Sequence, residues 1–329
     1  MNGKIALEEH WAIPETLQDS AGFVPGTYWD ELQNRLLDVQ GRRLELMDEH
    51  GIETMILSLN APAVQAIPDR RRAIEIAKRA NDALAEECAK RPDRFRAFAA
   101  LPLQDPDAAA QELQRCVTDL GFVGALVNGF SQDDQHGNGQ EPLYYDLPQY
   151  RPFWAEVARL DVPFYLHPRN PLAQDARIYD NHPWLLGPTW AFAQETAVHA
   201  LRLMACGLFD DHPSLQIVIG HMGEGIPAML WRMDNRNAWV DLPPTYPAKR
   251  RFVDYFTENF HITTSGNFRT QSLIDAILEL GADRIMFSTD WPFENIDHAA
   301  KWFDAASLSE ADRTKIGRTN AVSLFGLDR

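Results

Sequence analysis

The sequence predicts an α/β protein whose strands close into one (β/α)8 barrel, a TIM barrel, with long loops on its C-terminal face. Short apolar, β-branched segments recur eight times along the 329 residues, and longer helical patterns separate them. No glycine-rich dinucleotide loop interrupts this order, which counts against the alternative, a doubly wound open sheet. We therefore expect a single domain over residues 1–329.

Each expected strand is short and almost continuously apolar, as is typical of a parallel strand buried on both faces. The strands are predicted at residues 5–10, 54–59, 95–101, 123–128, 162–167, 216–221, 260–265 and 284–290. The main helices are predicted at residues 70–91, 107–119, 150–159, 196–209, 226–240 and 270–280.

Two connections are too long to be simple turns. They cover residues 11–40 and 168–193, both follow a strand, and both are rich in aromatic side chains. In a barrel they lie on the C-terminal face, where substrates bind, so we expect lids, binding loops or interfaces. A third insertion, residues 131–140, is polar and glycine-rich, and we expect a surface loop without a function.

The composition excludes several classes of partner. The formal net charge of −16 disfavours binding to nucleic acid or to anionic membranes. A carboxylate substrate would need a local cation, either a metal ion or an arginine. The chain has no secretory signal pattern and no long apolar run, and Cys88, Cys116 and Cys206 have no paired spacing. These features predict a cytoplasmic protein with reduced thiols.

Polar side chains interrupt the predicted strands at their C-terminal ends. Glu8 and His10 close the first strand, His167 the fifth, His221 the sixth and Asp290 the eighth. Because the C-terminal ends of all strands in a parallel barrel lie at the same mouth, we expect these side chains to converge there. Glu8 and His10 are two residues apart and share a face. Imidazole and carboxylate groups together suit Zn²⁺, Mn²⁺ or Fe²⁺.

Each of these residues also has an ordinary structural interpretation. A single histidine at a strand end is more often a hydrogen-bonded structural residue than a ligand. Asp290 precedes a helix and could cap it, and Glu8 could be a solvated residue beside Glu9. Five such residues at the ends of four separate strands, with Glu8 and His10 on one face of the first, favour the metal site.

Several long stretches of the chain resemble a known family. The pattern of Glu-x-His, His, His and Asp on strands one, five, six and eight is similar to that of the amidohydrolase superfamily. Within it, the chain closely resembles the γ-resorcylate (2,6-dihydroxybenzoate) decarboxylases, in the branch that also contains the aminocarboxymuconate semialdehyde decarboxylases. The stretches are GKIALEEHWAIPETLQDSAGFVPG, FYLHPRNPL, GHMGEG and FSTDWPFENIDHA, and the likeness covers essentially the whole chain.

The first ligand position departs from the wider superfamily, whose hydrolases usually carry His-x-His on strand one. Glu8 makes the site more anionic and favours Mn²⁺ or Mg²⁺ relative to Zn²⁺. We expect one divalent ion per subunit, Mn²⁺ first and Zn²⁺ second, with no organic cofactor. Its expected ligands are Glu8, His10, His167 and Asp290.

The resemblance implies decarboxylation of a hydroxybenzoate, most simply by protonation of the ring carbon that carries the carboxylate. Asp290 is the expected proton donor, although a metal-bound carboxylate has a low pKa and is a poor acid. His221 is expected beside Asp290 as a donor or proton relay. Glu224 is expected either to orient that imidazole or to stabilise the start of the following helix.

Four further residues are candidates for substrate contact. Phe23 and Phe293 are expected to flank the aromatic ring, Asn128 to end strand four at the mouth, and Arg232 to meet the anionic edge of the substrate. Each residue has an equally good structural interpretation. The two phenylalanines could simply pack in the core, Asn128 could only terminate its strand, and Arg232 could be a solvated helix residue. Arg232 could serve its own subunit or a neighbour, since the resemblance implies a homotetramer.

Two other functions compete with decarboxylation. A metal-dependent hydrolase on the same barrel would use Asp290 as a base. Glu8 argues against it, as does the lack of a lysine at the end of strand four. A non-catalytic barrel would not need a complete ligand set.

Overall fold

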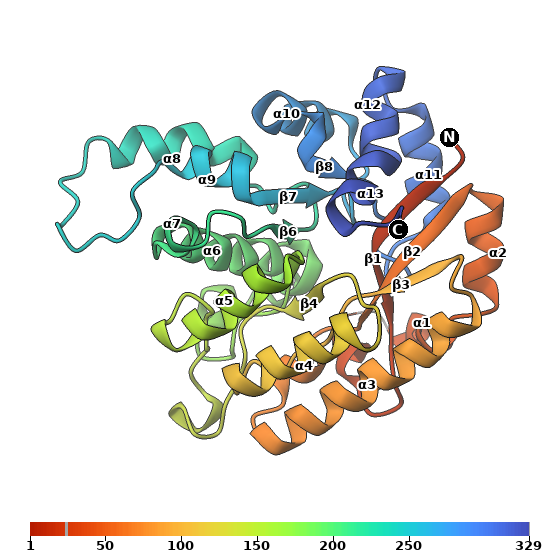
Figure 1. The fold of residues 1–329 in the computed structure, drawn as a ribbon, viewed down its shortest axis with the longest axis horizontal. Coiled ribbons are helices and arrows are strands. Elements are labelled where there is room, and N and C mark those ends of the chain that lie inside the picture. Colours follow the sequence, from red (N-terminus) through yellow and green to blue (C-terminus); the bar gives the residue numbers. More distant parts are fainter. Residues whose placement is uncertain (24–25, 329) are drawn as a thin grey trace.

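Parallel strands surrounded by helices make up the computed structural model, which describes residues 1–23 and 26–328 (Figure 1). Strands β1–β2–β3 form one sheet and β4–β5–β6–β7–β8 a second, each in sequence order and parallel throughout. The strands are β1 Lys4–Trp11, β2 Ile52–Leu59, β3 Phe95–Ala97, β4 Ala125–Asn128, β5 Phe164–His167, β6 Ile217–Ile219, β7 Phe260–Thr263 and β8 Ile285–Met286. Eight parallel strands in sequence order confirm the predicted TIM barrel.

Two seams without a regular ladder join the sheets into a ring. Just beyond β3, Ala99 forms an isolated parallel bridge with Ala125 of β4. Between β8 and β1, the His10 amide donates a hydrogen bond to the Trp291 carbonyl at 2.6 Å. The second seam lies at the C-terminal mouth, where the predicted site residues converge.

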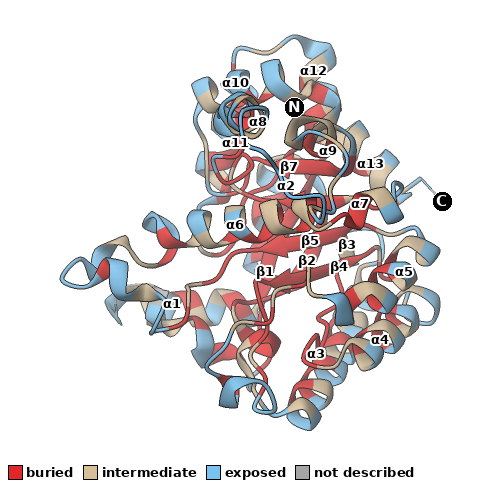
Figure 2. Cartoon of the chain, turned by 90° about the vertical axis from the view of Figure 1, so that its left-hand side faces the viewer, coloured by how far each residue is buried: buried red, intermediate tan, exposed pale blue. Residues whose placement is uncertain are grey.

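Helices cover the outside of the barrel, and buried residues gather on the strands at its centre (Figure 2). The helices are α1 Gly26–Leu37, α2 Arg42–Glu49, α3 Arg70–Lys90, α4 Pro106–Thr118, α5 Arg151–Leu160, α6 Ala191–Ala205, α7 Leu208–Asp211, α8 Leu230–Asn237, α9 Phe252–Asn259, α10 Thr270–Leu280, α11 Ile296–Ala305, α12 Glu310–Thr314 and α13 Asn320–Phe325. Within residues 1–23 and 26–328, none of the helices combines the length and apolar character needed to cross a membrane.

The N-terminal half of the barrel interior is an apolar cluster. Ile5 and Leu7 of β1 meet Val218 of β6 and Met286 of β8, and all four side chains are buried. Phe325 of α13 packs against this cluster and closes the N-terminal end of the barrel. A close-packed base of this kind resists deformation, so it supports the mouth above it.

A bulge in β1 changes which side chains face the interior. Between Ala6 and Glu9, β1 advances by three residues while its partner β2 advances by two. One extra residue in a strand reverses the alternation of side chains that follow it. As a result Glu8 and His10 point into the barrel mouth, while Glu9 turns outward between the strands.

The long connections and some strand ends differ from the sequence prediction. Residues 11–40 contain the helix α1, so this connection has secondary structure of its own. The segment 168–193 holds three short 3₁₀ turns and the first residues of α6. β6 ends at Ile219 and β8 at Met286, before His221 and Asp290, and both of these residues adopt left-handed backbone conformations that do not belong to a strand.

The polar insertion at 131–140 is less exposed than predicted. Ser131 and Asp133 are fully buried, and Asp133 forms an ion pair with Arg70 at 2.6 Å. A buried carboxylate needs such a partner, so the start of this insertion is anchored to α3.

Candidate metal centre and active site

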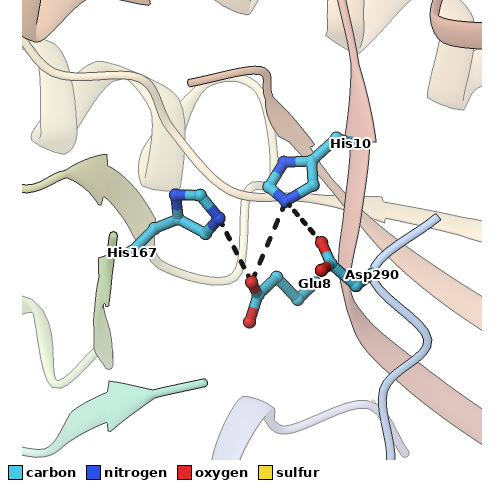
Figure 3. A group of neighbouring side chains, drawn as sticks. All are labelled: Glu8, His10, His167 and Asp290. Carbon is cyan, nitrogen blue, oxygen red and sulfur yellow. Dashed lines mark ion pairs between the residues drawn. The ribbon is translucent and has the colours of Figure 1, made fainter. Parts of the chain in front are cut away.

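The structure brings Glu8, His10, His167 and Asp290 together at the C-terminal mouth of the barrel (Figure 3). One ligand atom from each residue lies within 4.8 Å of the others. His167 Nε2 is 3.2 Å from Glu8 Oε1, and His10 Nε2 is 3.3 Å from Asp290 Oδ1. The four side chains come from β1, β5 and the segment after β8, so the convergence predicted from strand ends is present.

Two atoms at the centre of this group lack a partner that an ion would supply. Glu8 Oε1 and His10 Nε2 are buried and form no well-aligned hydrogen bond with any described residue. Burying such polar atoms unsatisfied costs about 1–3 kcal/mol each. Two imidazoles and two carboxylates are donors that Mn²⁺, Fe²⁺ and Zn²⁺ accept. The residues therefore fit one divalent cation.

Neighbouring polar groups hold the Glu8 carboxylate in place. The Tyr165 hydroxyl donates to Glu8 Oε2 and lies 2.8 Å from Thr263 Oγ1. Gly220 leaves the required space, because a Cβ atom there would lie 2.5 Å from Glu8 Oε2. His10 is the second potential ligand on β1. Its Nδ1 lies 3.2 Å from the Ser58 hydroxyl, and this contact leaves Nε2 free to bind the ion.

The ligand groups compensate one another's charge. Burial lowers the pKa of His10, but Asp290 and Glu8 outweigh it and raise that pKa to about 9. Burial raises the pKa of Glu8, yet His221 and the two ligand histidines hold it well below its ordinary value. Burial likewise opposes ionisation of Asp290, whose pKa is lowered by His10 and His221. Both carboxylates are therefore ionised, as metal ligation requires.

His221 lies at the edge of the ligand group. Its Nε2 is 3.5 Å from Glu8 Oε1 and 3.7 Å from Asp290 Oδ2, while its Nδ1 is 2.6 Å from Glu224 Oε1. Burial lowers the pKa of His221, but Glu224 and Glu8 outweigh it and raise that pKa well above its ordinary value. The imidazole is 22% exposed, so a ligand in the mouth can reach it.

The backbone is strained where the site is built. His221, Met222, Glu224 and Asp290 have φ values of 52°, 57°, 53° and 62°, in the left-handed region that side chains other than glycine rarely adopt. Such residues persist where surrounding contacts fix them, and they gather at functional sites. Gly266 leaves room for the His221 ring, because a Cβ atom at that position would lie only 2.9 Å from His221 Cδ2.

A cavity of about 740 Å³ opens beside His221 and Glu224. Its walls are mostly apolar and include Trp190, from the second long connection, and Met229. An apolar hollow with a few convergent polar groups is the usual form of a small-molecule site. The second aromatic connection thus lies next to the predicted catalytic groups.

The predicted substrate-contact residues fall into different environments. The Phe293 ring lies 5.5 Å from the His10 ring in an edge-on arrangement, at the rim of the ligand group. Asn128 ends β4, is buried and donates to a backbone carbonyl at 3.1 Å. Arg232 is exposed on α8 and is not among the residues that line the cavity. The Phe23 side chain lies outside the described residues.

Sequence reasoning missed three residues that support the site. Tyr165 lies two residues before His167 on β5, so the same alternation that paired Glu8 with His10 could have identified it. Ser58 gave no signal, because a single serine in an apolar strand is common. The third residue, Glu9, gave no signal in the sequence beyond its position next to Glu8.

A second group of potential ligands lies outside the barrel. It consists of Glu49, His50 and Asp297, where α2 meets α11. Asp297 is already paired with Lys301 at 2.7 Å, and Glu49 is 60% exposed. Solvent and the lysine satisfy these carboxylates, so the cluster is an ordinary surface feature.

A parallel barrel with a carboxylate–histidine cluster at its C-terminal mouth defines a metal-dependent barrel enzyme. Residues 34–327 match the family model described as amidohydrolase, and the chain belongs to this family. The resemblance noted in the sequence is thereby confirmed.

Several relatives are similar over their full length. The chain is 83% identical over 329 residues to a γ-resorcylate decarboxylase from Rhodococcus jostii (strain RHA1), covering 100% of both chains. A crystal structure of 2,6-dihydroxybenzoate decarboxylase complexed with 2,6-dihydroxybenzoate matches with a TM-score of 0.96 and 82% identity, covering 99% of this chain and 100% of that one. A dihydroxybenzoic acid decarboxylase from Polaromonas sp. JS666, with bound manganese and the inhibitor 2-nitroresorcinol, matches with a TM-score of 0.97 and 72% identity, covering 100% and 98%.

Proposed function

We propose that this protein is a metal-dependent, non-oxidative carboxy-lyase that converts 2,6-dihydroxybenzoate reversibly to resorcinol and CO₂. The observation that carries the proposal is the cluster of Glu8, His10, His167 and Asp290 with His221 at its edge. Relatives 83% and 82% identical over the whole chain are γ-resorcylate decarboxylases. This similarity favours decarboxylation over hydrolysis on the same barrel.

The reaction avoids a free aryl anion. Two hydroxyl groups ortho to the carboxylate donate electron density to the ring carbon that carries it, and this makes the carbon basic enough to accept a proton. The bond to the carboxylate then breaks, its electron pair restores the aromatic ring, and CO₂ leaves. The enzyme must hold the anionic oxygens, deliver one proton to the ring face and exclude water.

Glu8, His10, His167 and Asp290 would hold one divalent ion, with Mn²⁺ as the first candidate and Zn²⁺ as the second. When bound, this ion supplies the positive charge that attracts the carboxylate and phenolate oxygens of the substrate. An otherwise acidic protein, with a net charge of −16, thereby binds an anion. No organic cofactor enters the scheme.

Asp290 delivers the proton to the ring, and His221 resupplies it. In the free site the pKa of Asp290 is lowered, so the carboxylate must gain its proton when substrate binds. The His221 imidazolium, 3.7 Å from Asp290 Oδ2, is the nearby source. Glu224 orients that imidazole through the 2.6 Å contact with Nδ1. Catalysis by a positioned acid typically contributes about 10²–10⁴-fold.

The substrate ring is proposed to lie against Phe293, with Asn128 at the end of β4 and Phe23 on the opposite side. Arg232 is proposed to act in a neighbouring subunit, because it is exposed in its own. The segment that carries it extends from one side of the barrel (Figure 1), and Trp231 and Trp239 on it are 74% and 78% exposed. Large exposed aromatic groups favour burial between subunits.

We further propose that residues 1–329 form one domain, that the chain assembles into a homotetramer, and that it works in the cytoplasm. Two sheets that meet at both seams and share one main core support a single domain. The cysteines Cys88, Cys116 and Cys206 are all free, which suits a reducing compartment. Light scattering after size-exclusion chromatography tests the assembly.

The activity is tested on protein loaded with Mn²⁺ and given 2,6-dihydroxybenzoate. We expect stoichiometric resorcinol and CO₂, loss of activity on chelation, and recovery when Mn²⁺ is restored. Lactones and amides, offered in parallel, should not be hydrolysed. A preparation that is active without any metal, or that hydrolyses the lactones and leaves the benzoate intact, contradicts the proposal.

A further inference from the structure

Glu9 is a fully buried carboxylate that lies between two of the metal-site residues in sequence but points away from them. The bulge in β1 sends Glu8 and His10 into the mouth and leaves Glu9 facing β8. A buried charge is costly unless hydrogen bonds satisfy it. The hydrogen-bond partners of Glu9 therefore indicate its role.

All four acceptor positions of Glu9 are directed to the segment that carries Asp290. Oε1 accepts from the Thr289 amide at 2.8 Å and from the Ser288 hydroxyl at 3.2 Å. Oε2 accepts from the Thr289 hydroxyl at 2.5 Å and from the Trp291 amide at 3.3 Å. A carboxylate offers about four acceptor sites, so donors on Ser288, Thr289 and Trp291, which flank Asp290 in the chain, saturate Glu9.

Toward β1, the backbone of this segment is held by the hydrogen bond from the His10 amide to the Trp291 carbonyl and not by a regular ladder. The ladder with β7 ends at Met286, and no strand ladder joins β8 to β1 among the described residues. The Ser288 hydroxyl also accepts from the Glu8 amide at 2.7 Å, and so links Glu9 to the strand that bears the other ligands. Glu9 thus takes the place of the missing ladder at the seam between β8 and β1.

Asp290 depends on that support because its backbone is strained. Its φ of 62° lies in the left-handed region, which an aspartate occupies only when its surroundings fix it. The residues on either side, Thr289 and Trp291, are both held by the Glu9 carboxylate. Arg43, also fully buried, interacts electrostatically with Glu9 and donates a hydrogen bond to the His10 carbonyl.

We propose that Glu9 is a positioning residue that fixes Asp290 relative to the metal ion and to the substrate ring. Its two oxygens hold the segment 288–291 in register with β1, so the carboxylate of Asp290 can ligate the ion and still reach the ring carbon. The role in proton delivery rests on the proposed function, whereas the effect on the metal site does not.

The test compares Glu9→Gln with the wild-type protein. The substituted amide keeps the size of the side chain but replaces one acceptor oxygen with a donor, which opposes the donors on Thr289 and Trp291. We expect one Mn²⁺ per chain to remain bound, the Mn²⁺ electron paramagnetic resonance spectrum to change, and kcat to fall about 10–100-fold with KM within about twofold.

The matched control is Asn259→Ala. Asn259 is also buried and donates two hydrogen bonds to backbone carbonyls, but it lies before β7, at the opposite end of the barrel. This variant should melt at a lower temperature and keep the wild-type spectrum and kcat. A purely structural role for Glu9 would make Glu9→Gln behave like this control, and that result overturns the proposal.

A second variant covers the case in which Glu9→Gln does not fold. Thr289→Val removes only the hydroxyl bond to Oε2, and it should give a smaller change of the spectrum and a several-fold lower kcat. If Glu9→Gln is insoluble and Thr289→Val matches wild type in both, the proposal is wrong. If wild-type protein fails to decarboxylate, the proposed function fails, but the spectra still decide the role of Glu9.

Discussion

The interior of the barrel is apolar at one end and charged at the other. The N-terminal half is filled by side chains such as Ile5, Leu7 and Met286, and α13 closes it. The mouth holds the Glu8 and Asp290 carboxylates among imidazoles whose charges compensate them. Both halves are built from the same strands, and β1 contributes to each.

The difference shows how one strand serves stability and chemistry separately. The apolar base stabilises the fold by removing surface from water, and it has no group that could react. The mouth gathers charges that compensate one another, and it leaves two buried ligand atoms without a hydrogen-bond partner, which an ion would satisfy. Substitutions in the two halves should therefore separate activity from stability, and the following experiments probe that separation.

The largest effect is expected from Asp290→Asn. An amide cannot deliver the proton, so kcat measured at saturating Mn²⁺ should fall about 10³-fold. An amide is also a weaker ligand than a carboxylate, so Mn²⁺ should bind this variant less tightly than wild type. Asp297→Asn, at the exposed start of α11, is the control and should retain wild-type kcat. An Asp290→Asn variant within tenfold of wild type would remove this residue from the proton pathway.

Leu7→Ala should produce the opposite pattern. The side chain is fully buried in the apolar half, so its truncation should lower the free energy of unfolding by about 2–5 kcal/mol. Denaturant unfolding measures this loss, and kcat of the folded protein should stay within about twofold of wild type. A comparable loss of kcat would show that the two halves are not separable.

Tyr165→Phe should weaken metal binding. Loss of the hydroxyl leaves Glu8 Oε2 without its donor, and removal of such a supporting contact typically lowers metal affinity about 10–100-fold. Competitive titration with a metal indicator measures the dissociation constant of Mn²⁺. The control is Tyr145→Phe, which loses a buried hydrogen bond of 2.9 Å between the Tyr145 and Ser131 hydroxyls. This pair does not contact the metal ligands, so the variant should bind Mn²⁺ as wild type does.

The smallest step, about tenfold for each pH unit, is expected in the pH dependence of metal binding at the mouth. The pKa of His10 is raised to about 9 in the metal-free protein. Its protonated form therefore stabilises the apo fold fully below about pH 6.5, and this contribution is lost as pH rises through about 9. Because ligation displaces that proton, Mn²⁺ affinity should rise about tenfold per pH unit from 7 to 9 and then level off. Calorimetric titrations across this range measure it, and a flat profile would exclude His10 as a ligand.

Strand order and the convergence of side chains at the mouth could be predicted from the sequence, because both depend on periodicity. Glu8, His10, His167 and Asp290 each follow or end an apolar strand segment, and a closed barrel leaves them only one place to meet. The left-handed backbone at His221 and Asp290, beyond the ends of β6 and β8, could not be predicted, since tertiary contacts impose it.

The bulge in β1 escaped prediction for a related reason. Simple alternation from Ile5 and Leu7 would place Glu9 inside and Glu8 outside, yet the pairing with β2 inserts one residue and reverses them. The support that Glu9 gives to Thr289 is a contact between residues 280 positions apart. No local pattern encodes such a contact.

The central claim is that four side chains bind one ion while His221 stands beside Asp290. Diffraction from Mn²⁺-loaded crystals, measured at the manganese absorption edge, tests it most directly. We predict one strong anomalous peak per chain in contact with Glu8, His10, His167 and Asp290. A mouth without a peak, or a peak only at the surface cluster of Glu49, His50 and Asp297, would contradict the account.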